Sequence, residues 1–230
     1  MIARGRVRAV RGGVVHARLP LAAVGDAVTI ATLARRIAGR VEAIVEGISI
    51  VAPFDTVDGI AIGSPICTDP GARDVCVAPD VAQRAPIDRP LWTGVRAIDG
   101  LLSIGRGARV GIFGAPGTGK SSLVRAIVAN ARVDAVVVAA IGERGREAQE
   151  WHSIGDARTT IVCATGDRPA ARRVRATQEA FGLADRLRRR GLHVLLLFDS
   201  LARYAGALRE LGVASGEGLG RGGFPPSVSP

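Results

Sequence analysis

The segment with the clearest chemical signature is GAPGTGKS, residues 114–121, which fits the pattern G-x-x-x-x-G-K-[ST] in full. Gly114, Gly117 and Gly119 allow the backbone to curl, so that successive N–H groups point inward and attract phosphate oxygens at a helix start. Lys120 is the only lysine among the 31 lysine and arginine residues of the chain. Its compact ammonium suits a narrow phosphate pocket better than a planar guanidinium does. The alternative is a glycine-rich turn without a ligand.

We therefore predict that this segment binds ATP through its phosphates. Lys120 would contact the β- and γ-phosphates and so act in catalysis, while the Ser121 hydroxyl would be a ligand of Mg²⁺. The predicted nucleotide-binding residues run from the first glycine into the following helix: Gly114, Ala115, Pro116, Gly117, Thr118, Gly119, Lys120, Ser121 and Ser122.

Two acidic residues follow apolar segments that are typical of buried strands. Asp199 comes after HVLLLF (193–198), at the edge where open α/β sheets bind ligands, and is predicted to complete the Mg²⁺ site. Capping of the next helix is its alternative role. Glu143 follows AVVVAAI (135–141) and is predicted to polarise the attacking water, with Arg144 stabilising phosphoryl charge. For Glu143 the alternative is an exposed loop acid paired with an arginine.

The elements that must position these groups fall into two parts. Residues 1–83 contain short apolar segments with Gly or Pro breaks, a pattern that predicts an N-terminal β-barrel or sandwich. Residues 84–230 alternate apolar strands with helices, which predicts an α/β core with a mainly parallel sheet covered on both faces. Within it we expect a buried strand over RVGIF (109–113), directly before the glycine-rich loop.

Composition limits the classes of partner. The net charge of +10 suits nucleic acid, acidic proteins or lipid surfaces, but aromatic residues make up only 3%, too few for a base-stacking platform. We therefore expect no nucleic-acid partner. The clusters RRVR (172–175) and RLRRR (186–190) lie in one predicted helix, as a solvated face or a surface for an acidic partner. Apolar runs are too short to span a membrane, and three widely spaced cysteines suit a reducing compartment.

Several longer segments add a family resemblance. In the second part they are PLWTGVRAIDGLLSIGRGARVGIFGAPGTGKSSL, IGERGRE, LLLFDSLARYAGALRELG and GGFPPSVSP, and in the first part LPLAAVGDAV, GRVEAI and VAPFDTVDGIAIGSPI. Together they resemble the catalytic ATPases of flagellar and type III protein-export systems, relatives of the catalytic subunits of rotary ATP synthases. The resemblance implies a barrel followed by an incomplete RecA-like P-loop core.

The resemblance also implies an activity and an assembly. The protein would hydrolyse ATP to power protein export, with Glu143 as catalytic carboxylate, Lys120 and Ser121 on the phosphates and Mg²⁺, and Asp199 completing the metal site. It implies a homohexamer in the bacterial cytoplasm, with peripheral contact to the membrane-embedded export machinery and with secreted proteins or chaperones as partners. The arginine finger, adenine contact and C-terminal domain of the family are not in this sequence, so we expect slow hydrolysis.

Two other functions are compatible with the same residues. One is a nucleotide-binding or scaffold module without catalysis. The other is a ring-shaped nucleic-acid translocase, which would need a surface of clustered basic or aromatic residues facing a strand.

Overall fold

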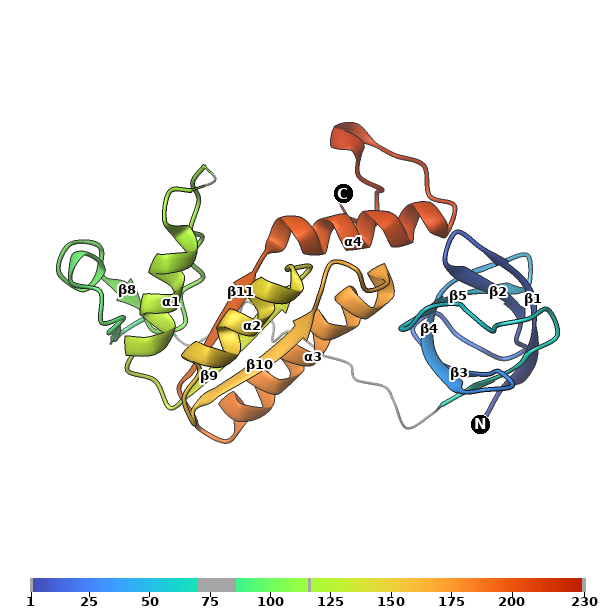
Figure 1. Ribbon diagram of the computed structural model, residues 1–230, viewed down its shortest axis with the longest axis horizontal. Coiled ribbons are helices and arrows are strands. Elements are labelled where there is room, and N and C mark those ends of the chain that lie inside the picture. The colour runs from blue at the N-terminus through green and yellow to red at the C-terminus, as the bar shows by residue number, and fades with distance from the viewer. Residues whose placement is uncertain (1, 70–85, 116, 229–230) are drawn as a thin grey trace.

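The computed structural model describes residues 2–69, 86–115 and 117–228 (Figure 1). Its first part is a closed barrel in the order β1-β2-β5-β4-β3-β6, so the predicted barrel is confirmed over a sandwich. The strands are β1 (Arg4–Arg11), β2 (Val14–Arg18), β3 (Ala27–Ala31), β4 (Arg36–Val45), β5 (Ile48–Pro53) and β6 (Pro65–Thr68). The predicted boundary between residues 83 and 84 lies outside the described residues.

Alternation of apolar and polar residues explains why these strands close into a barrel. Each strand directs every second side chain inward, and the inward positions are apolar. The buried core of the barrel consists of Ala3, Val7, Val15, Ala17, Leu19, Val28, Ile30, Ile37, Val41, Val51 and Ile66. The turn between β1 and β2 is Gly12-Gly13, with φ of 55° and 82°, which is the backbone that a tight hairpin requires. Closure pairs β1 with β6 and leaves the barrel without an open edge.

Gly5 in β1 marks the closest backbone approach in the barrel. A Cβ atom at this position would lie 1.9 Å from the carbonyl oxygen of Arg18 and 2.9 Å from the Cα atom of Leu19. Both neighbours are backbone atoms, so they cannot move aside without displacing the end of β2. Any side chain at position 5 therefore opposes barrel closure.

The second part is built around a parallel sheet. It contains β7 (Pro90–Leu91), the π-helical turn η2 (Ile98–Leu102), β8 (Ile104–Gly105), α1 (Lys120–Asn130), β9 (Ala135–Ile141), α2 (Gly145–Ile154), β10 (Thr159–Ala164), α3 (Ala170–Arg189), β11 (Val194–Asp199), α4 (Leu201–Ala214) and the 3-10 turn η3 (Arg221–Gly223). Three strands form the sheet in the order β10-β9-β11, both pairs parallel. The predicted parallel arrangement is confirmed.

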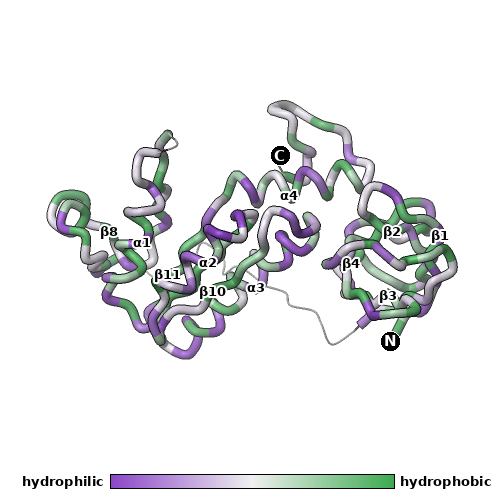
Figure 2. The backbone as a smooth tube through the Cα atoms, in the orientation of Figure 1, coloured by the Kyte–Doolittle hydropathy of each residue, from purple (hydrophilic) through white to green (hydrophobic). Residues whose placement is uncertain are grey.

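Helices cover both faces of this sheet, as predicted. Every residue of β9 is buried. On one face Val136 and Val138 pack with Ile127 of α1 and Trp151 of α2. On the other face α3 covers the sheet, contributing Ala176 and Ala180. Figure 2 shows the hydrophobic strands of the sheet next to the largely hydrophilic α3, which buries Ala171, Val174, Ala176, Thr177 and Ala180 and leaves most of its other residues half-buried.

The predicted buried strand over residues 109–113 is wrong. Residues 108–115 form neither strand nor helix, and Val110, Ile112 and Phe113 are 57%, 38% and 92% exposed. Within the described residues β11 pairs only with β9. An apolar segment becomes a buried strand only when a neighbour supplies hydrogen bonds and cover, and here neither is present. Sequence pattern alone cannot detect that missing neighbour.

The barrel contacts the core through a small apolar joint. Ala52 and Phe54, at the end of β5, pack against Ala171, Val174, Ala207 and Leu211 of α3 and α4. The Arg175 guanidinium carbon lies 5.7 Å from the centroid of the Phe54 ring, a cation–π contact.

The first arginine cluster of α3, RRVR (172–175), is not part of a solvated face, contrary to the prediction. Arg173 is only 11% exposed and pairs with Glu210 of α4 at 2.5 Å, and Arg175 lies in the joint. The later cluster does fit that prediction: Arg188 and Arg189 are more than half exposed, and both pair with Asp185.

We predict that Gly5→Ala lowers the free energy of unfolding by about 2 kcal/mol or more, because overpacking against backbone forces strand displacement. Urea-denaturation midpoints would measure the change. The matched control is Gly206→Ala, where no heavy atom lies within 4 Å of the new Cβ in the interior of α4. It should stabilise by about 0.5–1 kcal/mol. Equal midpoints for the two variants would contradict the argument from close approach.

Candidate nucleotide-binding and catalytic site

The glycine-rich loop folds into α1 with the backbone that its sequence predicts. Gly117 and Gly119 have φ of 79° and 85°, a region open to glycine but strained for other residues. A Cβ on either would meet no atom within 4 Å, so the space above the loop is open. The Lys120 ammonium donates hydrogen bonds to the carbonyl oxygens of Gly114 (2.6 Å) and Ala115 (2.7 Å). The ammonium therefore lies over the mouth of the loop.

The start of α1 offers unpaired backbone donors to an anion. Its N-cap is Gly119, no side chain caps it, and its first turn contains no acidic residue. Within the described residues, neither a capping side chain nor an acidic residue of the first turn compensates the first N–H groups and the positive end of the helix dipole. Ser121 and Ser122 are exposed beside them. Together with the open cradle and the ammonium, this donor set fits a phosphate chain. Pro116 lies outside the described residues.

Glu143 is buried at the carboxyl end of β9. The chain turns out of the strand at Gly142, whose φ is 74°, and a Cβ there would press on the Arg203 side chain at 3.0–3.1 Å. The Gly142 N–H donates to the carbonyl oxygen of Ala164, and the Gly166 N–H donates to the carbonyl oxygen of Glu143. These bonds hold the turn against the end of β10. The Glu143 side chain is only 7% exposed, so the predicted alternative of an exposed loop acid is wrong.

Arg203 of α4 holds this carboxylate in place. Its Nη1 atom lies 2.5 Å from Oε1 of Glu143 and 3.8 Å from Oε2 of Glu147. The same nitrogen donates to the carbonyl oxygen of Gly142 at 3.0 Å. One guanidinium thus joins the turn after β9, the first turn of α2 and the first turn of α4.

Three carboxyl groups share this small volume. Burial, a hydrogen bond with Glu147 and the negative charge of Asp199 raise the pKa of Glu143 to about 7, although Arg203 opposes the shift. The hydrogen bond with Glu143 lowers the pKa of Glu147, as does the backbone N–H of Arg144. Near neutral pH the Glu143 carboxyl is therefore protonated in part of the population, and its O–H then donates a hydrogen bond to the Glu147 carboxylate.

Asp199 ends β11 and faces the same edge. Burial raises its pKa, while the charges of Arg203 and Arg125 oppose the shift. Its alternative role as a helix cap is not observed, since the N-cap of α4 is Ser200 and no side chain caps that helix. Arg125 lies in α1 and pairs with Glu150 of α2. It therefore brings α1 within electrostatic reach of Asp199.

The described residues do not bring every predicted group together. No hydrogen bond or ion pair of the described chain joins Lys120 or Ser121 to Glu143 or Asp199. Arg144 is exposed at the N-cap of α2. It is linked to the acidic cluster through its backbone N–H, which bonds Glu147, and through its charge, which also lowers the pKa of Glu147. Thus Glu143 and Asp199 are neighbours, and the described link from the helix that follows the phosphate loop is the charge of Arg125 acting on Asp199.

The donor set near Asp199 is compatible with a magnesium nucleotide. In the described ranges no group of three or more His, Cys, Asp or Glu side chains could enclose a metal ion. Mg²⁺ usually takes one or two protein ligands and fills its shell with phosphate oxygens and water. Asp199 and the Ser121 hydroxyl fit that sparse pattern.

Comparison with known proteins gives this geometry a family. Residues 94–230 match the nucleotide-binding domain of the ATP synthase alpha/beta family. The chain belongs to the ATP synthase alpha/beta family. Its fold, a barrel before a parallel-sheet core, agrees with that membership.

Its relatives include secretion and flagellar proteins. The type 3 secretion system ATPase of Pseudomonas syringae pv. tomato is 36% identical over 97% of this chain and 60% of its own length. The flagellum-specific ATP synthase of Treponema pallidum is 46% identical over 64% of this chain and 34% of its own length. The chain thus spans about 60% of the length of the type 3 secretion relatives that it matches along nearly its whole length.

A solved structure agrees with both parts of the fold. The assembled ATPase EscN from the type III secretion system of enteropathogenic E. coli superposes with a TM-score of 0.85 at 36% identity, over 97% of this chain and 63% of EscN. EscN in complex with its central stalk EscO matches with a TM-score of 0.83 at 35% identity, over 97% and 64% of the two chains. Among the described residues of this family member, no helix is long and apolar enough to cross a membrane.

Sequence reasoning missed Arg203 and Glu147 in this alpha/beta-family site. Both signals were present but weak. Arg203 follows Asp199 by four residues, so one turn of the next helix returns it to the same edge. Glu147 stands at the third position of α2, where a glutamate commonly bonds the N-cap backbone N–H.

We predict that the shifted carboxyl makes stability fall as pH rises. Between about 4.5 and 7 the folded protein keeps the Glu143 proton that the unfolded chain has lost, so the free energy of unfolding declines through that window. Glu143→Gln should remove the decline. Between pH 4.5 and pH 8 its free energy of unfolding should therefore increase relative to that of wild type by on the order of 1–3 kcal/mol. The lowered pKa of Glu147 acts only at more acidic pH.

Urea-denaturation midpoints across this pH range would measure the effect. The control is Glu46→Gln, in the exposed turn between β4 and β5, which should keep the wild-type pH dependence. A Glu143→Gln profile parallel to wild type would show that the carboxyl titrates normally.

Proposed function

We propose that the protein is an ATP-binding and ATP-hydrolysing subunit that powers protein export of the type III kind. The observation that carries this proposal is the buried Glu143 carboxyl, held by Arg203 beside Asp199, in a chain that also contains a complete phosphate loop. Support comes from the secretion and flagellar ATPases that it resembles.

The loop residues have distinct roles in binding. The N–H groups at the start of α1 would surround the phosphate oxygens, and the Lys120 ammonium would leave its two carbonyl partners to contact the β- and γ-phosphates. Gly117 and Gly119 keep this space free of side chains. When bound, Mg²⁺ would neutralise phosphate charge, with Ser121 and Asp199 as its protein ligands.

The acidic cluster of Glu143, Glu147 and Asp199 would position the water that attacks the γ-phosphate. The ionised Glu143 carboxylate would accept a hydrogen bond from a water and orient it toward the γ-phosphate. Ion pairing with Arg203 fixes the carboxylate and counteracts the pKa increase caused by burial, so that the ionised form persists near neutral pH. Arg144, which borders Glu143 in the chain, would stabilise charge on the transferring phosphoryl group.

Assembly and partners follow from the resemblance. We propose a homohexamer with nucleotide between subunits, because the related EscN is described as an assembled ATPase. Export-apparatus components and exported proteins or chaperones are its proposed partners, and the bacterial cytoplasm its location, with peripheral contact to the export machinery.

We predict that Lys120→Ala weakens Mg-ATP binding at least about tenfold, because the loop loses its one ammonium contact to the phosphates. Calorimetric titration of the purified protein would measure the affinity. The control is Arg186→Ala, which removes the same charge from an exposed position on α3 and should leave the affinity unchanged. Equal affinity for Lys120→Ala and wild type would sink the nucleotide-binding proposal.

We predict that Glu143→Gln lowers ATP turnover by about 10²–10⁴-fold while nucleotide affinity stays within about threefold, because it removes the base and keeps the shape of the side chain. Phosphate release would be followed beside the calorimetry. Unchanged turnover would reject Glu143 as the base. ATP binding without turnover in either protein would favour the non-catalytic nucleotide-binding module.

A further inference from the structure

A basic cleft lies between the barrel and the core, outside the nucleotide site. Its volume is about 630 Å³, and its walls come from the start of β4, the residues after β5, the carboxyl end of β10 and the start of α3. Three guanidinium groups line it, those of Arg36, Arg168 and Arg172, and Asp55 is its acidic residue. The cleft therefore combines cations from two parts of the fold.

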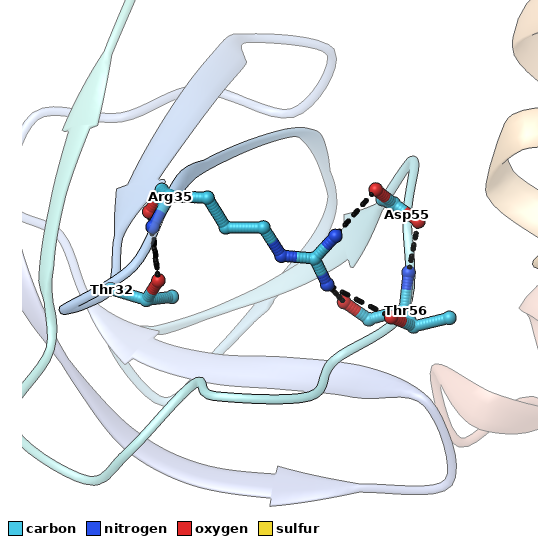
Figure 3. Close-up of polar contacts among 4 residues, drawn as sticks. All are labelled: Thr32, Arg35, Asp55 and Thr56. Carbon is cyan, nitrogen blue, oxygen red and sulfur yellow. Dashed lines mark hydrogen bonds and ion pairs between the residues drawn. The ribbon is translucent and has the colours of Figure 1, made fainter.

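The acidic groups around this cleft are already engaged. Arg35 donates to the Asp55 carboxylate at 2.8 Å and also contacts Thr56, as Figure 3 shows. Asp55 accepts a further bond from the Thr56 N–H. Asp167, next in the chain to Arg168, accepts a hydrogen bond from the Thr165 side chain.

Two of the three arginines lie outside the ion pairs of the described chain, although the charge of Arg168 lowers the pKa of the neighbouring Asp167. Arg172 shares Glu179 with Arg175. In the described part of the chain neither Arg36 nor Arg168 forms an ion pair. Three arginines and one aspartate, itself paired with Arg35, thus give the cleft lining a net positive charge. Guanidinium forks match the tetrahedral oxygens of phosphate.

The cleft adjoins the acidic cluster through β10. Ala164 in its wall accepts the hydrogen bond from Gly142, and Gly166, just beyond Thr165, donates to the Glu143 carbonyl. Cys163, also in the wall, has its pKa raised by burial and by the negative charge of Glu143, while the charge of Arg172 lowers it. A phosphate freed beside Glu143 would therefore have a cationic pocket one strand away.

We propose that the barrel–core cleft formed by Arg36, Arg168 and Arg172 is a binding site for inorganic phosphate. Only the source of that phosphate, hydrolysis beside Glu143, rests on the proposed function. Binding itself depends on the cleft. Arg36 belongs to the barrel and Arg168 to the core, so a bound phosphate would bridge the two parts.

The reactivity of Cys163 tests this site. In a Cys67→Ser/Cys76→Ser protein Cys163 is the one remaining cysteine. Its alkylation rate with neutral N-ethylmaleimide would be followed at pH 8 while sodium phosphate replaces sodium chloride at constant ionic strength. Bound phosphate should raise the thiol pKa and cover the wall, slowing alkylation saturably by about threefold or more.

Variants identify the ligands of the phosphate. Arg168→Gln and Arg36→Gln, made separately in this background, should each raise the half-saturating phosphate concentration about tenfold or more. Arg186→Gln, at an exposed position elsewhere on α3, removes the same charge and should change nothing. Circular dichroism melts would show which variants fold like the parent protein. If only one of the two cleft variants folds, its phosphate titration is sufficient for the test.

Any of three results of the phosphate titration would overturn the proposal: no saturation, saturation curves in the cleft variants that match the parent protein, or loss of saturation in Lys120→Ala. The last would assign the phosphate to the glycine-rich loop. Slowing by a poly-glutamate peptide but not by phosphate would also overturn it, in favour of an acidic protein segment. Failure of phosphate binding leaves ATP binding by the loop untouched, so the two proposals fail separately.

Discussion

The site depends on the close approach of several carboxyl groups at one edge of a small sheet, where Arg203 balances their negative charge. Parallel strands end together, so acids that follow them must meet. Glu143 and Asp199 do so, and the first turn of α2 adds Glu147. Three ionised carboxylates this close together, one of them buried, would repel one another. Arg203 offsets the repulsion from α4, and a shared proton between Glu143 and Glu147 relieves the remainder.

This balance explains why three separate elements converge on the same point. Gly142 gives the turn that buries Glu143, and it leaves space for the Arg203 side chain. The 2.5 Å ion pair and the carbonyl bond from one nitrogen then tie α4 to β9. An anion arriving at this edge would compete with the carboxylate for the same guanidinium. Such an anion would thereby act on both α4, which carries Arg203, and the ionisation of Glu143.

Much of the fold and part of the candidate site could be predicted from the sequence, because patterns of adjacent residues determine them. The glycines of the phosphate loop, the apolar strand of β9 and the 20-residue helix α3 each carry their signal in adjacent residues. The exposed segment 109–113 could not be predicted, since its state depends on whether another strand borders it. The role of Arg203 depends on its contact with Glu143, which lies 60 residues earlier in the chain. Which arginines of α3 are buried in contacts and which are exposed depends on the part of α3 that packs against the barrel and α4. A sequence pattern indicates which residue types lie along one face of a helix or strand, but it does not indicate which element packs against that face.

The joint between barrel and core has a mechanical consequence. Its contacts are aliphatic side chains, the aromatic rings of Phe54 and Tyr204, and the Arg175 guanidinium near the Phe54 ring. Such contacts have weak angular preference compared with hydrogen bonds. A modest tilt of the barrel thus changes which atoms touch without breaking a directional bond at the pivot. Force applied to the outer end of the barrel would be delivered through Phe54 to the first turns of α3, beside the strand ends where the acids gather.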